Sequence, residues 1–233
     1  MFKYNDDNFI FDVSWTSIST HSKFDELFKK TWIEKEEKNL FRYKYKSQNV
    51  VRLPGKYQFI KVLNIDRATK RRTPASFHKV LQPFDDSLFN FTKINHEEYL
   101  FKLESPYNSC ENSSDDILAI NSSPLGDFHS LILPKISSKL PQSINNYSLH
   151  LSLQILLLSA SPAMRIGYNS LCAYASVNHL HLHFYYLPYK MYLETCEVEY
   201  LSGSCYIIKD YPGKGFVFFL CSIDKILDLV RIF

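Results

Sequence analysis

Three histidines at alternate positions are the residues of this chain best suited to chemistry. His179, His181 and His183 alternate with leucine and phenylalanine in the run ASVNHLHLHFYYL at residues 175–187. A β-strand sends successive side chains to opposite faces, so this spacing predicts three imidazoles on one face and apolar residues on the other. Only eight histidines occur among the 233 residues, and packing alone does not account for three on one face. We therefore interpret the run as a functional site.

The predicted spacing also bears on the charge of the imidazoles. Neighbouring side chains on one face of a strand lie roughly 6.6 Å apart. Two unit charges at that distance repel by roughly 2.5 kcal/mol at an effective dielectric of about 20, which corresponds to about two pKa units. Because a free imidazole has a pKa of about 6.5, the three cannot all be protonated near neutral pH. At least one should be neutral and nucleophilic.

A metal site is the competing interpretation of the same histidines. Neutral imidazole is the commonest metal ligand, and two histidines two residues apart can bind zinc or iron. No carboxylate with tight spacing accompanies the run, because Glu194 and Glu197 lie beyond the predicted end of the strand. We predict no metal and no cofactor, and keep a metal-dependent enzyme that uses two of the three histidines as an alternative.

The histidine run resembles the signature of the histidine triad superfamily of nucleotidyl transferases and hydrolases. The wider string GYNSLCAYASVNHLHLHFYYL is similar to the GDP-D-glucose phosphorylases, relatives of plant GDP-L-galactose phosphorylases and, more distantly, of galactose-1-phosphate uridylyltransferases. Further segments agree in the expected order, among them SKFDELFKKTW, LNIDRATKRRTP, FNFTKINHEEYLFKL and INSSPLGDFHSLILP. The resemblance extends from about residue 22 to residue 219. It implies an α+β fold, an antiparallel sheet with flanking helices of the histidine triad and uridylyltransferase type.

The resemblance also implies a reaction and a role for each histidine. Guanylyl would pass from GDP-glucose to inorganic phosphate through a covalent guanylyl-histidine, giving GDP and glucose 1-phosphate. The middle histidine, His181, would be the nucleophile, while His179 and His183 would hold or protonate phosphate oxygens. The scheme requires no metal or other cofactor. Water in place of phosphate would turn the transfer into hydrolysis.

Five further residues are candidate nucleotide or phosphate contacts. Asn169 and Ser176 match positions at which relatives hold phosphate oxygens, and Asn121 matches an asparagine that commonly meets the ribose. Arg71 and Arg72 close a basic run just before a proline. A guanidinium fork matches phosphate oxygens bidentately, and a solvated loop is the alternative interpretation of the same run.

Two residues near these candidates depart from the pattern of the relatives. Phe128 and Cys172 stand where relatives carry glycine. Glycine adopts backbone conformations that other residues disfavour, so we expect the two substitutions to alter the turns. We interpret His129, which follows Phe128, as a structural hydrogen-bonding histidine.

Composition limits the classes of function. The chain is 45% hydrophobic and 22% charged with a net charge of +3, which neither requires nucleic acid nor excludes a phosphate-bearing ligand. Five cysteines without a CxxC pair suit reduced thiols in a cytoplasmic protein. Neither a secretory signal nor a membrane span is expected. We expect small-molecule substrates and no nucleic-acid or membrane partner, with a homodimer as one alternative for the oligomeric state.

The elements that must position these residues follow from periodicity and turn signals. Ser22 and Asp25 resemble a capping box at the start of an amphipathic helix that reaches about Asn39. Further helices are expected at residues 148–160 and 223–232. Strands are expected at residues 40–45, 57–65, 99–103, 117–121, 130–133, 164–168, 206–208 and 216–220.

The predicted domain organisation is simple. Residues 1–21 are expected to wrap the surface, and residues 22–233 to form one histidine triad-like catalytic domain. The resemblance implies a substantial carboxy-terminal portion in full-length relatives, so the domain looks shortened at that end. A shortened, inactive nucleotide-binding protein is therefore the second alternative to an active phosphorylase.

Overall fold

The chain forms two compact units. The computed structural model describes residues 1–16, 22–45, 50–105 and 115–219. The first unit comprises Met1–Lys46 and Asn64–Tyr186, and the second comprises Ser47–Leu63 and Leu187–Phe233. The division predicted from the sequence, a wrapping segment at 1–21 and one domain at 22–233, stays a prediction.

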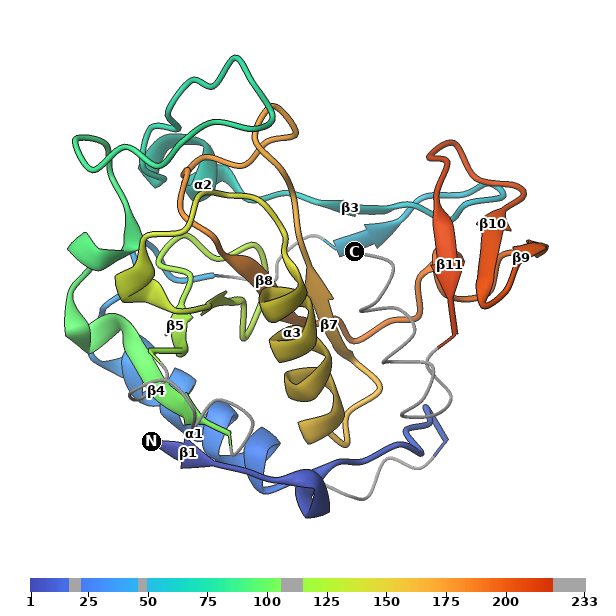
Figure 1. The fold of residues 1–233 in the computed structure, drawn as a ribbon, viewed down its shortest axis with the longest axis horizontal. Coiled ribbons are helices and arrows are strands. Elements are labelled where there is room, and N and C mark those ends of the chain that lie inside the picture. The colour runs from blue at the N-terminus through green and yellow to red at the C-terminus, as the bar shows by residue number, and fades with distance from the viewer. Residues whose placement is uncertain (17–21, 46–49, 106–114, 220–233) are drawn as a thin grey trace. The chain divides into compact units, whose positions relative to one another are not determined.

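A six-stranded sheet forms the centre of the first unit (Figure 1). The strands lie in the order β1-β4-β5-β6-β8-β7, and all neighbours run antiparallel except β1 and β4. Their bounds are β1 Phe2–Lys3, β4 Tyr99–Glu104, β5 Ile117–Ile120, β6 Ser130–Leu133, β7 Met164–Gly167 and β8 Leu182–Tyr186. The predicted α+β fold with an antiparallel sheet is confirmed.

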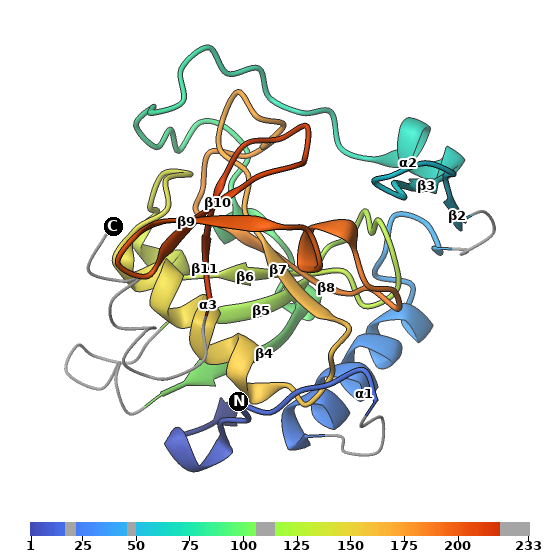
Figure 2. The ribbon, with the colours of Figure 1, turned by 90° about the vertical axis from the view of Figure 1, so that its right-hand side faces the viewer.

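Two helices pack on one face of this sheet, α1 (Lys23–Glu37) and α3 (Asn146–Leu158) (Figure 2). Both were expected from periodicity, and the Ser22 hydroxyl caps α1 by accepting from the Asp25 N–H at 3.0 Å. The main apolar core lies between the helices and the sheet, where the rings of Phe28 and Phe184 approach to 4.6 Å. No helix in the described part of the chain is long and apolar enough to cross a membrane.

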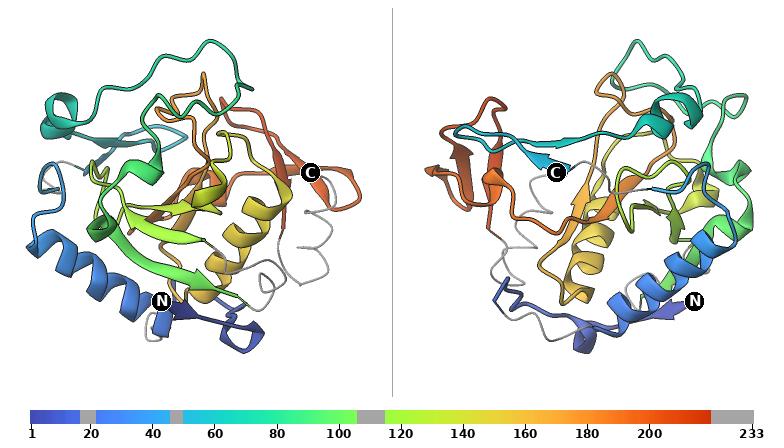
Figure 3. Two further views of the ribbon diagram at one scale, coloured as in Figure 1. Left: turned by 60° about the vertical axis from the view of Figure 1, so that its left-hand side comes forward. Right: turned by 180° about the vertical axis from the view of Figure 1, so that it is seen from behind.

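A buried carboxylate ties the two helices to β8. Asp25, in α1, accepts from the Ser159 hydroxyl at 2.6 Å and from the Ala160 N–H at 2.9 Å, both just after α3. The Tyr186 hydroxyl at the end of β8 donates to the same carboxylate. Hydrogen bonds to a charged group are stronger than neutral ones, so this cluster fixes β8 against both helices. Figure 3 shows the two helices, blue and gold, beside the strands of the sheet.

The opposite face of the sheet carries a smaller core. Its buried members are Phe91, Ile117, Ala119, Leu131, Leu133, Ile136 and Val177. Phe91 comes from the 3-10 turn η2 (Phe91–Lys93), and Ile136 comes from the 3-10 turn η5 (Ile136–Ser138). Along β8, Leu182 and Phe184 face the helices, whereas His183 lies opposite Leu131 and so faces the smaller core. The alternation predicted from the sequence therefore holds within β8.

The strand prediction for residues 175–187 is wrong at its beginning. β8 starts at Leu182, so only His183 of the three histidines lies in a strand. The ladders with β6 and β7 begin at Leu182 and His183, and no strand among the described residues pairs with the preceding backbone. It pairs instead with a loop, where the Leu180 N–H donates to the Leu140 carbonyl at 2.8 Å.

Another prediction near the site is also wrong. Residues 40–45 form no strand, because their polar groups bond singly to a loop, as in the 2.6 Å bond from the Tyr43 hydroxyl to the Pro124 carbonyl. In the basic run, Arg71 and Arg72 lie outside any helix or strand, directly after the short helix α2 (Ile65–Lys70), which contains Arg67 and Lys70. Its start is fixed by Asn64, whose side chain accepts from the Arg67 N–H at 3.0 Å.

The second unit consists of two small antiparallel sheets. β2 (Val50–Arg52) pairs with β3 (Ile60–Val62), and β10 (Cys205–Ile208) pairs with both β9 (Val198–Ser202) and β11 (Phe216–Phe218). The strands expected near residues 206–208 and 216–220 are present, and β9 was not predicted. The helix expected at 223–232 lies outside the described residues. The 3-10 turn η6 (Tyr192–Glu194) also belongs to this unit, whereas the 3-10 turns η1 (Asp6–Asn8) and η3 (His96–Glu98) belong to the first unit.

Candidate active site

A cavity of about 720 Å³ in the first unit gathers most of the predicted site residues. His181 and His183 form part of its wall. The candidate phosphate and nucleotide contacts also line it, namely Asn121, Asn169, Ser176, Arg71 and Arg72. His179 is not on the wall. Residues far apart in sequence thus meet around one space, as the resemblance implied.

Two long loops, residues 71–90 and 168–181, lie side by side (Figure 1). Both contribute residues to the cavity wall. The Ala75 N–H donates to the Ser176 carbonyl at 3.4 Å, and the Asn178 amide donates to the Pro83 carbonyl at 2.7 Å. These bonds hold the loop that contains the arginines against the loop that leads to the histidines.

The imidazole of His181 is fixed in one tautomer. Its Nδ1 lies 2.8 Å from the carbonyl oxygen of His179. A carbonyl only accepts hydrogen bonds, so Nδ1 carries the hydrogen and donates it. In the neutral ring, Nε2 then holds the free lone pair, which is the atom that attack on phosphorus requires.

His183 takes the opposite tautomer because of His129. The Leu125 N–H donates to Nδ1 of His129 at 2.9 Å, so the hydrogen of that neutral ring lies on Nε2. This Nε2 is 3.0 Å from Nδ1 of His183, which therefore accepts. The hydrogen of His183 then lies on its own Nε2. The two cavity histidines thus offer one lone pair and one N–H.

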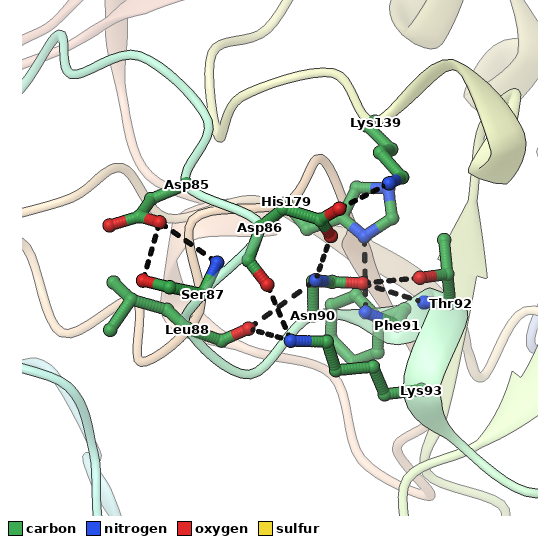
Figure 4. Close-up of polar contacts among 10 residues, drawn as sticks. All are labelled: Asp85, Asp86, Ser87, Leu88, Asn90, Phe91, Thr92, Lys93, Lys139 and His179. Atoms are coloured by element: carbon green, nitrogen blue, oxygen red, sulfur yellow. Dashed lines mark hydrogen bonds and ion pairs between the residues drawn. The ribbon is translucent and has the colours of Figure 1, made fainter.

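His179 does not line the cavity with these two histidines, and Figure 4 shows the contacts of its ring. Its Nδ1 accepts from the Phe91 N–H at 3.1 Å, and its ring also hydrogen-bonds to the backbone of Ile136. Its side chain is only 1% exposed. The ring nitrogens of His179 are thus engaged by the backbone, and its carbonyl orients the ring of His181. The phosphate contact expected of His179 stays a prediction.

A polar cluster supports the backbone that holds His179 (Figure 4). The Asn90 side chain begins η2 by accepting from the Thr92 N–H at 3.1 Å, and its amide donates to Asp86 at 3.2 Å. Asp86 also forms an ion pair with Lys139 at 2.6 Å. In the sequence this turn is marked only by Asn90, a residue type preferred at the start of helical turns.

Burial keeps the site imidazoles neutral. Desolvation lowers the pKa of His181 to about 4 and that of His183 to about 3. Repulsion from a protonated His181 ring and from Arg67 lowers the pKa of His183 further. Burial likewise holds the pKa of His129 well below its usual value. Desolvation is thus a larger cause of their neutrality than the repulsion among imidazoles expected from the sequence.

The three arginines near the cavity are held differently. Arg67 donates to the Ser123 carbonyl, and the side chain of Arg71 is exposed. The guanidinium of Arg72 lies 3.3 Å above the Phe89 ring, and burial lowers its pKa to about 10. Its Nη1 is buried and has no hydrogen-bond partner among the described residues. An anionic ligand in the cavity would supply the missing acceptor.

The amide of Asn121 closes another side of the wall. Its Oδ1 accepts from the Ser123 N–H at 3.0 Å, and its Nδ2 lies 3.2 Å from Nε2 of His129. In the tautomer described above that nitrogen carries a hydrogen, so we interpret this second approach as packing. The Asn169 amide donates to the Ala173 carbonyl at 3.0 Å and thereby shapes the loop before His181.

The two departures from the glycine pattern keep the backbone expected of glycine. Phe128 and Cys172 have φ angles of 61° and 62°, in the left-handed region. Such a backbone costs a side-chain-bearing residue roughly 1–2 kcal/mol. The Phe128 ring compensates by packing against Trp32 at 5.1 Å. The expectation of altered turns is therefore wrong for the backbone, which stores strain instead.

Two residues at the site were missed or undervalued in the sequence. His129 was interpreted as structural, yet its ring sets the tautomer of His183. Tyr185 lines the cavity and stacks on His129 at 4.3 Å. Its signal was the continued alternation of β8, which puts Tyr185 on the same strand face as His183.

Few side chains near the cavity histidines are available as metal ligands. No group of three or more histidine, cysteine, aspartate or glutamate side chains in the described part of the chain is placed to hold a metal ion. Since the ring of His179 is engaged by the backbone, the metal-dependent alternative reduces to His181 with His183. Cys172, Cys196 and Cys205 are free thiols.

Comparison with known proteins agrees with this arrangement. A GDP-D-glucose phosphorylase 1 of Danio rerio is 37% identical over 94% of this chain and 63% of its own length. The Homo sapiens protein of the same name is 38% identical, over 85% of this chain and 52% of its own length. A GDP-L-galactose phosphorylase 2 of Arabidopsis thaliana is 39% identical over 79% of this chain and 47% of its own length. The chain thus spans about half to less than two thirds of these relatives.

The family assignment rests on the first unit. No solved structure matches the chain significantly. A family model described as GDPGP1-like, N-terminal domain, matches residues 23–185. This match includes the cavity-lining histidines and all five candidate contacts, and it confirms the resemblance seen in the sequence. The chain therefore belongs to the GDPGP1-like family.

Proposed function

We propose that the chain is a nucleotidyltransferase that moves guanylyl from GDP-glucose to inorganic phosphate through a covalent guanylyl-His181. One observation carries the proposal. The Nδ1–H of His181 is held by the His179 carbonyl at 2.8 Å, which leaves the Nε2 lone pair on a ring that lines the cavity. The names of the relatives, GDP-D-glucose and GDP-L-galactose phosphorylases, supply the substrate class.

In the first step, Nε2 of His181 attacks the α-phosphorus of GDP-glucose. The bond from that phosphorus to the bridging oxygen breaks, and glucose 1-phosphate leaves with the electron pair. The N–H on Nε2 of His183 donates to a phosphate oxygen as charge develops. Because burial keeps His181 neutral, no proton has to leave it before attack.

The binding groups follow from the cavity wall. Arg72, with its unsatisfied Nη1, is the proposed partner of a phosphate oxygen. Asn169 and Ser176 are the proposed donors to the pyrophosphate, and Asn121 is the proposed ribose contact. Arg71 is exposed on the same wall and adds positive charge.

In the second step, inorganic phosphate attacks the phosphorus of guanylyl-His181. The P–N bond breaks, the electron pair returns to Nε2, and GDP is released. Water in place of phosphate would release GMP. Small-molecule substrates, no nucleic-acid or membrane partner and a cytoplasmic location accompany this proposal, with a homodimer as one alternative.

Labelled substrate tests the proposal. Purified protein is mixed with GDP-glucose labelled at the α-phosphate, without phosphate, and acid-labile label on the protein is counted. We expect label on the parent and on His96→Ala, an exposed-histidine control, and none on His181→Ala. An unlabelled parent that still binds GDP-glucose in a separate titration would contradict the proposal.

A second candidate is a nucleotide-binding protein without turnover, because the chain spans 52% of the length of the human relative named a phosphorylase. Binding of GDP-glucose without covalent label would support this candidate. Stoichiometric metal in purified protein, lost in His183→Ala, would instead support the metal-dependent alternative.

A further inference from the structure

A buried glutamine grips the backbone of His181. Gln142 is 1% exposed. Its Oε1 accepts from the His181 N–H at 2.9 Å, and its Nε2 donates to the His181 carbonyl at 3.0 Å. A carboxamide offers the same donor and acceptor as a peptide group. Since β8 begins only at Leu182, the side chain takes the place of the strand that His181 lacks.

The same carboxamide reaches the loop before the histidines. Its Nε2 also donates to the carbonyl of Asn169 at 3.0 Å. Asn169 begins the loop that forms the cavity wall up to Ser176. Both amide hydrogens of Gln142 are therefore used, one on the nucleophile and one on the proposed phosphate loop.

The glutamine is itself held in place. Its backbone N–H donates to Oδ1 of Asn178 at 2.9 Å, and its carbonyl accepts from the Tyr168 hydroxyl at 3.0 Å. The Leu180 N–H bonds to the Leu140 carbonyl two residues away at 2.8 Å. Because the backbone of Gln142 is held by these bonds, its side chain can fix the position of the His181 backbone.

We propose that Gln142 is a positioning residue, which sets the place of the His181 ring relative to the loop of residues 169–176. The inference rests on the proposed function, because the position of His181 matters to catalysis only if its Nε2 attacks a phosphate held by that loop. Attack requires atoms about 3–3.5 Å apart, and a displacement of about 1 Å can slow a reaction about 100-fold.

A near-isosteric substitution isolates this role. Gln142→Met fills similar space but removes all three side-chain hydrogen bonds. Gln154 offers a matched control, because it is also buried and bonds through Oε1 to the Tyr4 hydroxyl at 2.8 Å, yet it does not line the cavity. Gln154→Met should therefore reproduce the cost of burying methionine without touching the site.

Two measurements separate positioning from packing. At saturating GDP-glucose, we expect label to form on Gln142→Met about 10- to 100-fold more slowly than on the parent, whereas Gln154→Met stays within about twofold. In nitrogen-15 spectra of the ring, His181 should be an Nδ1–H tautomer in the parent and in Gln154→Met. In Gln142→Met it should become a mixture of tautomers. Parent behaviour in a folded Gln142→Met protein, or equal losses in both variants, would overturn the inference.

A measurement on the unchanged protein covers the cases in which the variant fails to fold or the parent forms no label. The His181 amide lies outside any strand, yet its bond to Gln142 should protect it from hydrogen exchange as strongly as the Phe184 amide in β8. Exchange at the rate of an exposed loop would overturn the inference whatever the activity. Protection without label would uphold the grip of Gln142 and count only against the proposed function.

Discussion

The two halves of the histidine run are neighbours in sequence but are held by different means. β8 is hydrogen-bonded to a strand on each side and buries Leu182 and Phe184 in the main core. Among the described residues no strand pairs with residues 175–181, which are held by side chains, above all those of Gln142 and Asn178. Ladder hydrogen bonds stabilise the half in β8. The other half carries His181, the proposed nucleophile, on the wall of the cavity.

The largest expected difference between the halves is in stability. Phe184→Ala removes a fully buried ring that contacts Phe24 and Phe28, and it should lower the free energy of unfolding by about 3–5 kcal/mol. Ser176→Ala on the cavity wall should change it by no more than about 0.5 kcal/mol. Urea unfolding of both variants measures the contrast. Similar losses would show that the two halves are equally structural.

The next largest effect is a loss of fold stability in acid, caused by the buried histidines. His181 and His183 have pKa values of about 4 and 3 in the folded chain, below the ordinary 6.5. The unfolded chain therefore binds more protons below pH 6.5. Stability should be full above that pH and fall toward pH 4 by about 1.4 kcal/mol per pH unit for each such ring.

Unfolding measured at several pH values between 6.5 and 5 checks this slope. His129→Asn removes one ring whose pKa is held well below normal by burial, so its slope should be smaller by one proton. An unchanged slope in that variant would mean that His129 titrates normally in the folded chain.

Substitution of Arg72 should weaken ligand binding more than it lowers the stability of the fold. Arg72→Met removes the guanidinium whose buried Nη1 has no hydrogen-bond partner in the described part of the chain, so GDP-glucose should bind about 10- to 100-fold more weakly, a loss of about 1.5–3 kcal/mol. Lys70→Met removes the same charge from an exposed residue paired with Asp66 and should change binding less than threefold, roughly the value of a surface ion pair. Calorimetric titration distinguishes them, and equal effects would reduce Arg72 to a general contribution of charge.

The smallest effect concerns backbone strain beside the site. Cys172→Gly relieves a left-handed residue, φ 62°, and should stabilise the chain by up to about 1 kcal/mol over Cys172→Ala. Phe128→Gly relieves the same strain but loses the contact with Trp32, so it should destabilise. Thermal unfolding of the three variants gives the signs. Destabilisation by Cys172→Gly would show that the turn is unstrained.

Local patterns predicted much of this molecule from its sequence. The capping box at Ser22 and helical spacing located α1, and apolar runs bounded by turn residues located β5 and β6. Alternation placed His183 on the face opposite Leu182. In each case the signal and the structure involve residues close together in the chain.

What the sequence did not reveal depends on distant partners. The start of β8 at Leu182 is set by where β6 and β7 pair with it, and the partner of His181 is Gln142, 39 residues earlier. The tautomers of the site likewise depend on the Phe91 backbone and on His129. A single buried glutamine or a distant N–H has no periodic signature, so the pattern of residues 175–187 gives no sign of these partners.

The position of the covalent adduct tests the account most directly. The parent is incubated with GDP-glucose without phosphate, digested under conditions that preserve phosphorus–nitrogen bonds, and mapped by mass spectrometry with fragmentation. The account predicts guanylyl on His181 alone, lost when phosphate is added as GDP appears. Guanylyl on His179 or His183, or no adduct on protein that binds GDP-glucose, would contradict it.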